Sequence, residues 1–159
     1  MPTRNIIEFR SKNEVIQIFR MHDGYRDSSI ILLQEFLKWN GKRNEQLGHT
    51  VCNFVHWYKT KNKAYSNSYY MNKIDVNDHA HTGLSLISLG IPIRNFKQAR
   101  EEYGAEAFWI IDLDKKTIKE IDDKFSYGFE PILTQEHFDN VWKKHHDWSK
   151  DEYVKEESK

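Results

Sequence analysis

The stretch that decides the fold is IIEFRSKNEVIQIFRMHDGYRDS, residues 6–28. Its two β-branched and aromatic runs, 6–10 and 15–19, flank the polar residues 11–14, which predicts a β-hairpin with a four-residue loop. The second run ends at Arg20, and Gly24 then precedes Asp27 and Ser28, two residue types that commonly cap a helix. The sequence therefore predicts a strand that breaks at a glycine turn and leads directly into a helix.

Four helices and a second hairpin are expected along the chain. The first helix ends near Gly41, where a left-handed C-terminal cap is expected. The second carries Cys52 on what we expect to be a buried position, and the third ends at Gly104. The expected ranges are 28–40, 47–63 and 95–103 for three helices and 107–112 with 117–121 for the second hairpin, and a last helix is expected to begin at 134. Residues 84–89 fit either a strand or a helix, and 65–82 a long loop.

These elements indicate an α+β fold. Alternating βαβα units are absent, so we predict an antiparallel sheet built from two hairpins, packed against about three helices and covered by them on one side. The length of 159 residues suits one globular domain over 1–149. The polar residues 150–159 are expected to form a disordered tail.

Composition excludes several classes of protein. The lone cysteine, Cys52, permits neither an internal disulfide nor a cysteine-based zinc site. No apolar run reaches the length of a signal peptide or a membrane span, which predicts a cytoplasmic protein without membrane association. The net charge of zero hides an asymmetry: residues 1–100 carry 15 Lys+Arg against 8 Asp+Glu, and residues 101–159 carry 9 against 16. The two halves either face each other in the fold or mark a basic binding face.

The first candidate site is the junction between the second strand and the first helix. Gly24 permits a backbone conformation that other residues resist, and a helix start leaves free N–H groups. Arg20 and Arg26 add positive charge, which together predicts a ligand-binding site for a protein or a small anionic ligand. The expected ligand-contacting residues are Arg20, Gly24, Tyr25, Arg26, Ser28 and Ser29. The alternative is a purely structural turn in which Asp23 and Asp27 cap backbone amides.

The same junction suggests an enzymatic alternative. His22 or Asp23 would act as general base toward a phosphoester or nucleotide, with Arg20 stabilising negative charge. An enzyme requires these residues to converge in one concave pocket with a second polar cluster, whereas a binding module does not. Because no complete set of nucleophile, base and stabiliser is visible in the sequence, we expect a binding module first.

The junction also resembles a known motif. Arg20, Asp23, Gly24 and Tyr25, between a predicted strand and a predicted helix, are similar to an uncharacterised family of phage and prokaryotic proteins in which a strand ends in Arg-His-Xaa-Asp-Gly-Tyr-Pro. Residues 106–112 are similar to a later aromatic hairpin strand of the same family. Met21 stands at the family's histidine position and Arg26 at its proline position. The resemblance supports the fold and implies no activity.

A second candidate is a metal site in the polar loop. Asp75, Asp78, His79 and His81 supply carboxylate and imidazole ligands of the kind that zinc or manganese accepts. A further ligand would come from His22, His49 or His56. The alternative is that these residues are solvated parts of a loop, in which case the protein holds no cofactor.

A third candidate is a basic aromatic segment, residues 57–73, with four lysines, five aromatic rings and no acid. Lys59, Lys61, Lys63 and Tyr69 suit a single-stranded nucleic acid, since lysines reach phosphates while rings stack on bases. Against this, Trp57 and Tyr58 fit the core face of the second helix, and the isoelectric point near 7.1 is not that of a typical nucleic-acid-binding domain.

Overall fold

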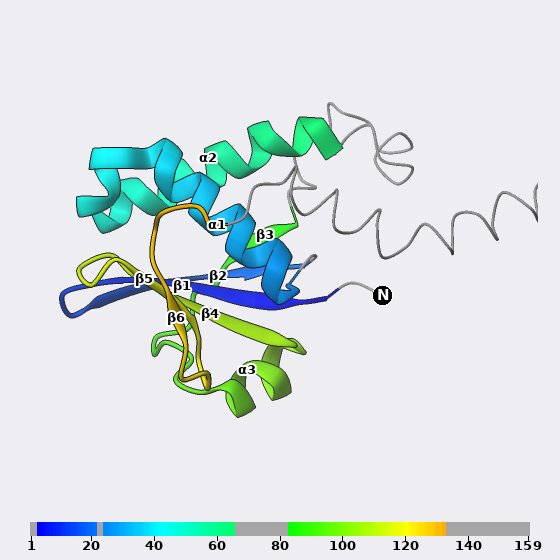
Figure 1. Cartoon of the computed structure of the whole chain (residues 1–159). Helices are drawn as coiled ribbons and strands as arrows, with labels where there is room; N and C mark the ends of the chain where they lie inside the picture. The colour runs from blue at the N-terminus through cyan, green and yellow to red at the C-terminus, as the bar shows by residue number, and fades with distance from the viewer. Residues whose placement is uncertain (1–2, 22–23, 66–82, 133–159) are drawn as a thin grey trace, which may run out of the picture.

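A computed structural model of the chain describes residues 3–21, 24–65 and 83–132, with only the backbone described for 60–65. The described residues form an α+β architecture with a six-stranded sheet and three α-helices (Figure 1). The elements are β1 (Asn5–Ser11), β2 (Glu14–Arg20), α1 (Arg26–Asn40), the 3-10 helix η1 (Gly41–Glu45), α2 (Leu47–Tyr65), β3 (Leu84–Leu86), α3 (Phe96–Tyr103), β4 (Ala107–Asp112), β5 (Thr117–Glu120) and β6 (Ser126–Tyr127). The expected helix from 134 and the expected tail at 150–159 lie outside the described residues.

The sheet has the order β3-β2-β1-β4-β5-β6. Both expected hairpins are confirmed: β1 pairs antiparallel with β2, and β4 pairs antiparallel with β5. The two hairpins meet through a parallel pairing of β1 with β4, in which Ile7 lies opposite Trp109. The sheet is therefore mixed, and the expectation of a purely antiparallel sheet is wrong. The ambiguous segment 84–89 begins with a strand, β3, which pairs antiparallel with β2.

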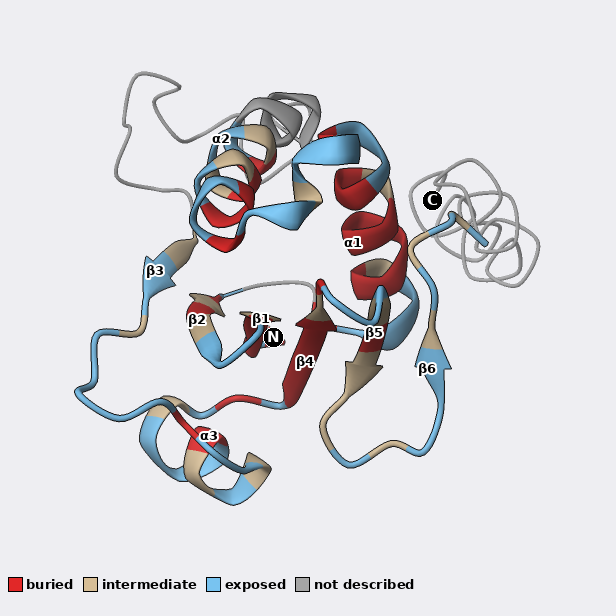
Figure 2. Cartoon of the chain, turned by 90° about the vertical axis from the view of Figure 1, so that its left-hand side faces the viewer, coloured by how far each residue is buried: buried red, intermediate tan, exposed pale blue. Residues whose placement is uncertain are grey.

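Helices cover both faces of the sheet, so the expectation of one covered face is also wrong. Figure 1 shows α1 and α2 on one side and α3 on the other. The physical reason is the sequence of the central strands. β1 and β4 are buried at nearly every successive position, and because neighbouring side chains point to opposite faces, both faces are covered. Figure 2 shows the central strand β4 buried along most of its length.

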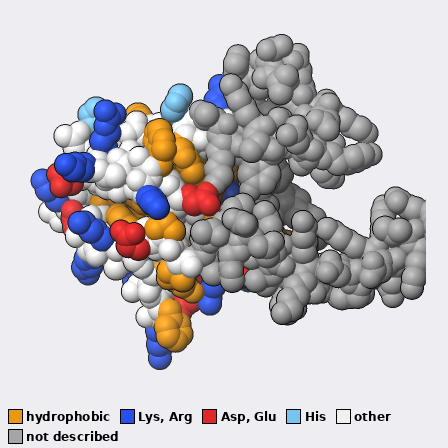
Figure 3. All heavy atoms as spheres, turned by 45° about the horizontal axis from the view of Figure 1, so that its top comes forward, with side chains coloured by type: hydrophobic (Ala, Val, Ile, Leu, Met, Phe, Trp, Pro, Cys, Tyr) orange, Lys and Arg blue, Asp and Glu red, His pale blue; other side chains and the backbone are white. Residues whose placement is uncertain are grey.

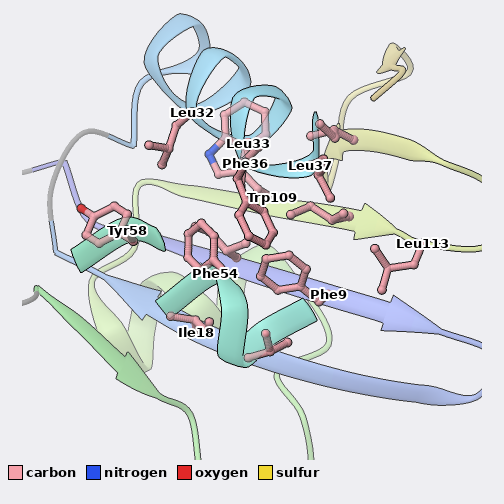
Figure 4. Close-up of a cluster of buried hydrophobic side chains, with 14 of the residues drawn as sticks. Phe9, Ile18, Leu32, Leu33, Phe36, Leu37, Phe54, Tyr58, Trp109 and Leu113 are labelled. Carbon is pink, nitrogen blue, oxygen red and sulfur yellow. The ribbon is translucent and has the colours of Figure 1, made fainter. Parts of the chain in front are cut away.

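The face under α1 and α2 holds the larger core, in which a group of aromatic rings packs among more numerous aliphatic side chains (Figure 4). Phe54 of α2 lies at the centre, with ring centroids 5.4 Å from Phe9 of β1 and 5.1 Å from Phe36 of α1. Tyr58 is buried and Trp57 packs against the same cluster, as expected. Aromatic pairs at these distances add about 0.5–1.5 kcal/mol each beyond the burial of their area.

The face under α3 holds a smaller core and a polar link. Ile6, Phe108 and Ile110 pack there with Ala99 of α3. Gln17 of β2 is buried and binds the backbone of Ile93 on both sides: its Nε2 donates to the carbonyl oxygen at 2.7 Å, and its Oε1 accepts from the N–H at 2.8 Å. Gln17 thus holds the segment between β3 and α3 against the sheet.

The two hairpin loops lie at one end of the sheet and are tied together by Asp114. Its carboxylate accepts from the backbone N–H of Lys12 at 2.5 Å and from Ser11 Oγ at 3.0 Å. These hydrogen bonds, the first above all, lower the pKa of Asp114. The first loop is Lys12–Asn13, because Ser11 and Glu14 still pair, so the expected four-residue loop is wrong. Lys12 adopts a φ of 57° to close this tight turn.

The residues that begin and end α3 and α1 can be compared with the capping residues expected from the sequence. In α3, Asn95 caps the first turn by accepting from the N–H of Gln98, and the helix ends at Gly104 as expected, with Gly104 in the left-handed conformation. Gly41 ends α1 with a φ of 58° and a ψ of −125°, which is not the left-handed conformation, so the cap expected there is wrong. At the start of α1 the cap is Tyr25, not Asp27 or Ser28, and no side chain makes a capping hydrogen bond there.

The expectation that Cys52 occupies a buried position is wrong. Cys52 is exposed, because the buried face of α2 runs through Val51, Phe54 and Tyr58 and Cys52 lies about 100° around the helix from Val51. Among the described residues, no helix combines the length and the apolar character needed to cross a bilayer.

Candidate functional site

The turn at Gly24 carries the chain across one end of the sheet, from β2 to the start of α1. The Gly24 N–H donates to the carbonyl oxygen of Thr3 at 3.0 Å. A Cβ at position 24 would lie 2.9 Å from that oxygen and 2.9 Å from Asn5 Cβ. Gly24 does not have a positive φ, so the expected special backbone conformation is wrong. Glycine is needed here because two backbones pass at close range.

The side chain of Asn5 links the chain segments that meet at this crossing. The side chain is fully buried, and its Nδ2 donates to the carbonyl oxygens of Thr3 at 3.2 Å and Arg20 at 3.3 Å. It therefore links the segment before β1 to the last residue of β2. A buried amide in this role fixes the position at which the chain leaves the sheet.

Arg20 is buried beneath α2, on the face of the larger core. Its Nε lies 3.2 Å from the hydroxyl oxygen of Tyr58, and its guanidinium carbon lies 5.4 Å from the centroid of the Tyr58 ring. Only 3% of the residue is exposed. Arg20 therefore contributes a cation–π contact to the packing of α2 and does not lie in the open hollow described below.

Arg26, in contrast, lies at the outer end of the crossing, beside β5. Its Nη2 is 3.2 Å from Glu120 Oε2 and also contacts Asp123 Oδ2. The hydrogen bond to Glu120 and the charge of Asp123 raise the pKa of Arg26 above its usual value. Since β2 and β5 are three strand spacings apart, about 14 Å, the strands that position Arg20 and Arg26 are well separated. The two arginines do not form one anion site.

The remaining residues of the junction divide between surface and interior. Tyr25 is 60% exposed, Ser28 is half-buried and Ser29 is buried. His22 and Asp23, the expected general bases, lie outside the described residues. Of the expected ligand-binding residues, Tyr25 and Arg26 are thus the ones that present exposed side chains to a partner.

An open hollow of about 560 Å³ lies beside Arg26, where α1 begins and β5 ends. Its walls come from the first turn of α1, the start of α3, the residue before β4 and the β5–β6 connection. The lining residues are Arg26, Phe96, Glu106, Glu120, Ile121, Asp122, Asp123 and Phe125. Of these lining residues, only Arg26 was predicted from the sequence as a site residue. The missed signal is the pair Asp122-Asp123, followed closely by Phe125, directly after a predicted strand.

The hollow is acidic and has apolar walls. Four carboxylates face one guanidinium, and Phe96, Ile121 and Phe125 supply the hydrophobic surface. Phe125 is 72% exposed, the highest value among the large hydrophobic side chains of the described residues. An acidic lining disfavours an anion, so the described part of the junction gives no support to a small anionic ligand at this place.

The metal and nucleic-acid candidates fall largely outside the structure. Asp75, Asp78, His79, His81 and Tyr69 lie outside the described residues, and Lys61 and Lys63 are described only as backbone. His49, His56 and Lys59 are exposed on α2. Within residues 3–21, 24–65 and 83–132, no group of three potential ligands is placed to hold a metal ion. On the face shown in Figure 3, the described basic and acidic side chains are intermingled and form no basic stripe.

Comparisons of the chain with protein-family models, with curated proteins and with solved structures find no match.

Proposed function

We propose that this protein is a binding module that recognises a segment of another protein in the hollow beside the Gly24 turn. The observation that carries the proposal is the hollow itself. It combines an exposed aromatic ring, Phe125, with an apolar wall and charged groups held in place by the Arg26 ion pairs. Interfaces between proteins place aromatic residues in such positions and draw most of their energy from a few of them.

The catalytic alternative receives less support from the described residues. Arg20, its proposed electrostatic stabiliser, is buried against Tyr58 and is absent from the lining of the hollow. His22 and Asp23 lie outside the described residues, so their part in this alternative stays a prediction. A binding module requires no convergence of these groups, and it is the function that the described geometry supports best.

The proposal is tested by selection from a random peptide library on the full chain. Affinities of the selected peptides are then measured by fluorescence anisotropy against wild type and Phe125→Ala. We expect Phe125→Ala to weaken binding about tenfold or more, the loss typical of an aromatic hot spot. The matched control is Leu86→Ala, because Leu86 is 63% exposed and lies on β3 at the opposite edge of the sheet.

Two results would contradict the proposal. One is a library selection that enriches no peptide at all. The other is a set of peptides that bind wild type and Phe125→Ala with equal affinity. Since Phe125 is largely exposed, its truncation leaves the fold intact, and a lost interaction is therefore not explained by unfolding.

A further inference from the structure

Resting on the proposed function, we infer that the segment recognised by the hollow is basic: it carries a lysine or arginine beside an apolar residue. Charge complementarity is the first argument. Four carboxylates line the hollow against a single guanidinium, so the lining has an excess of negative charge. The surrounding sequence has the same sign, since residues 101–132 hold nine Asp+Glu and four Lys+Arg.

The four carboxylates are not equivalent. Glu120 and Asp123 are occupied by Arg26, which lies between α1 and the β5–β6 connection. Glu106 and Asp122 are both exposed, and neither forms an ion pair with any residue in the described ranges. Glu106 and Asp122 are thus available to a cation of the partner, whereas Glu120 and Asp123 already bind the guanidinium of Arg26.

Arg26 shows how the hollow accepts a cation. Its guanidinium takes two carboxylates at once, one from the end of β5 and one from the following connection. A second cation that enters the hollow would meet Glu106 and Asp122, two further carboxylates of the same lining. Charge-assisted hydrogen bonds of this kind are shorter and stronger than neutral ones, and arginine in particular reads paired carboxylate oxygens.

The apolar lining favours a peptide side chain over a bare metal ion or a small amine. Phe96, Ile121 and Phe125 offer surface for the methylene stem of a lysine or arginine, and an exposed ring can hold the cationic head above its face. An adjacent apolar residue of the partner would cover the remaining exposed area of Phe125. The partner is therefore a protein segment, and an anionic polymer such as a nucleic acid is excluded from this hollow by its charge.

The test has two readouts. The first is the composition of the peptides selected on the wild-type protein, and the second is the change in their affinity when the charges of Glu106 and Asp122 are reversed. We expect selected peptides rich in Lys and Arg next to apolar residues, with affinity falling several-fold as sodium chloride rises from about 0.05 to 0.5 M. The variant Glu106→Lys/Asp122→Lys should bind these peptides at least tenfold more weakly, and selection on that variant should enrich acidic peptides instead.

The matched control is Glu14→Lys/Glu45→Lys, which changes the net charge by the same amount at two exposed residues that do not line the hollow. This control should bind the wild-type peptides almost unchanged. Neutral or acidic peptides that still depend on Phe125 would overturn the inference of a basic partner and leave the binding function standing. Peptides that are insensitive to Phe125→Ala would overturn both.

Discussion

The two ends of the sheet are built in different ways. At one end, the hairpin loops are short and exposed, and Asp114 links them through hydrogen bonds to Ser11 and Lys12. At the other end, the chain crosses over the start of β1 through Gly24, with Asn5 and Thr3 packed beneath it. At the first end each turn is local in sequence, and the Asp114 hydrogen bonds then join two turns that are about a hundred residues apart. The second end is closed by contacts between distant segments, and it carries the hollow.

The two ends differ in how many elements meet at one point. Connections that cross a sheet bring several elements to one point, and here the starts of α1 and α3 meet the end of β5 and the residue before β4. A hairpin loop joins only the two strands that it connects. The crossing end therefore offers a concave surface with contributions from four segments, and we expect the substitutions below to affect the two ends unequally.

The largest effect is expected for Gly24→Ala. The added Cβ would lie 2.9 Å from Thr3 O and from Asn5 Cβ, so the backbone must shift. We expect a loss of about 1–3 kcal/mol in the free energy of unfolding, measured by urea denaturation. The matched control is Gly48→Ala in α2, where a Cβ meets nothing within 4 Å and the helix gains from alanine. Equal stabilities of Gly24→Ala and wild type would show that the crossing is not closely packed.

The next effect is expected for Asn5→Ala. The substitution removes the donor to the carbonyl oxygens of Thr3 and Arg20 in a fully buried place. A buried hydrogen bond contributes about 0.5–1.5 kcal/mol, so the removal of two predicts a loss of about 1–3 kcal/mol by the same measurement. Asn13→Ala, in the exposed first hairpin loop, serves as control and should lower stability less. A larger loss of stability for Asn13→Ala than for Asn5→Ala would show that the crossing end is not held more tightly than the hairpin end.

A smaller effect is expected for Asp114→Asn at the hairpin end, and it should depend on pH. The hydrogen bonds to Asp114 lower its pKa in the folded state. The carboxylate therefore stabilises the protein fully above its unfolded pKa of about 3.9, and this contribution is lost as the pH falls through the folded-state pKa. Melting temperatures of wild type and variant should differ at pH 7 and converge in acid. A constant difference across this range would argue against the charge of Asp114 as the cause.

The smallest effect on stability is expected for Arg26→Gln. Exposed ion pairs contribute little because solvent screens them and ordering the side chains costs entropy. We expect an almost unchanged melting temperature, with faster amide hydrogen exchange in the β5–β6 connection, where the N–H of Phe125 donates to Asp123. Lys38→Gln, on an exposed lysine of α1, should leave that exchange unchanged. A large drop in melting temperature would mean that Arg26 has a structural role at the crossing end.

Local sequence signals predicted the parts of the fold that are local. Both hairpins and the end of the third helix at Gly104 follow from residues within a few positions of one another. The parallel pairing of Ile7 with Trp109 did not, because nothing in either strand specifies a partner a hundred residues away. The position of α3 on the second face was not predictable for a related reason: which helix covers each face of β1 and β4 depends on contacts between segments that are distant in sequence.

In the candidate site, too, single residues could be identified from the local sequence, whereas their contacts with distant segments could not. Gly24 was identified from its neighbours, but its reason for being glycine depends on Thr3 and Asn5, which only the folded chain brings beside it. Arg20 and Arg26 lie six residues apart in sequence, and the structure places them on opposite sides of the crossing. Glu106, Phe96 and Phe125 carry no motif, so their convergence with Arg26 was not predictable from the sequence.

The parallel contact of β1 with β4 also has a consequence for how the chain assembles. β1 lies near the N-terminus, yet its second neighbour in the sheet ends at Asp112. During synthesis, at roughly 5–20 residues per second, β2 is complete within about two seconds of β1, while the other edge of β1 waits for about a hundred more residues. Long-range strand pairing slows folding, and an open apolar edge invites pairing with other chains in that interval. We therefore expect nascent chains that end before Ala107 to aggregate more readily than those that extend past Asp112.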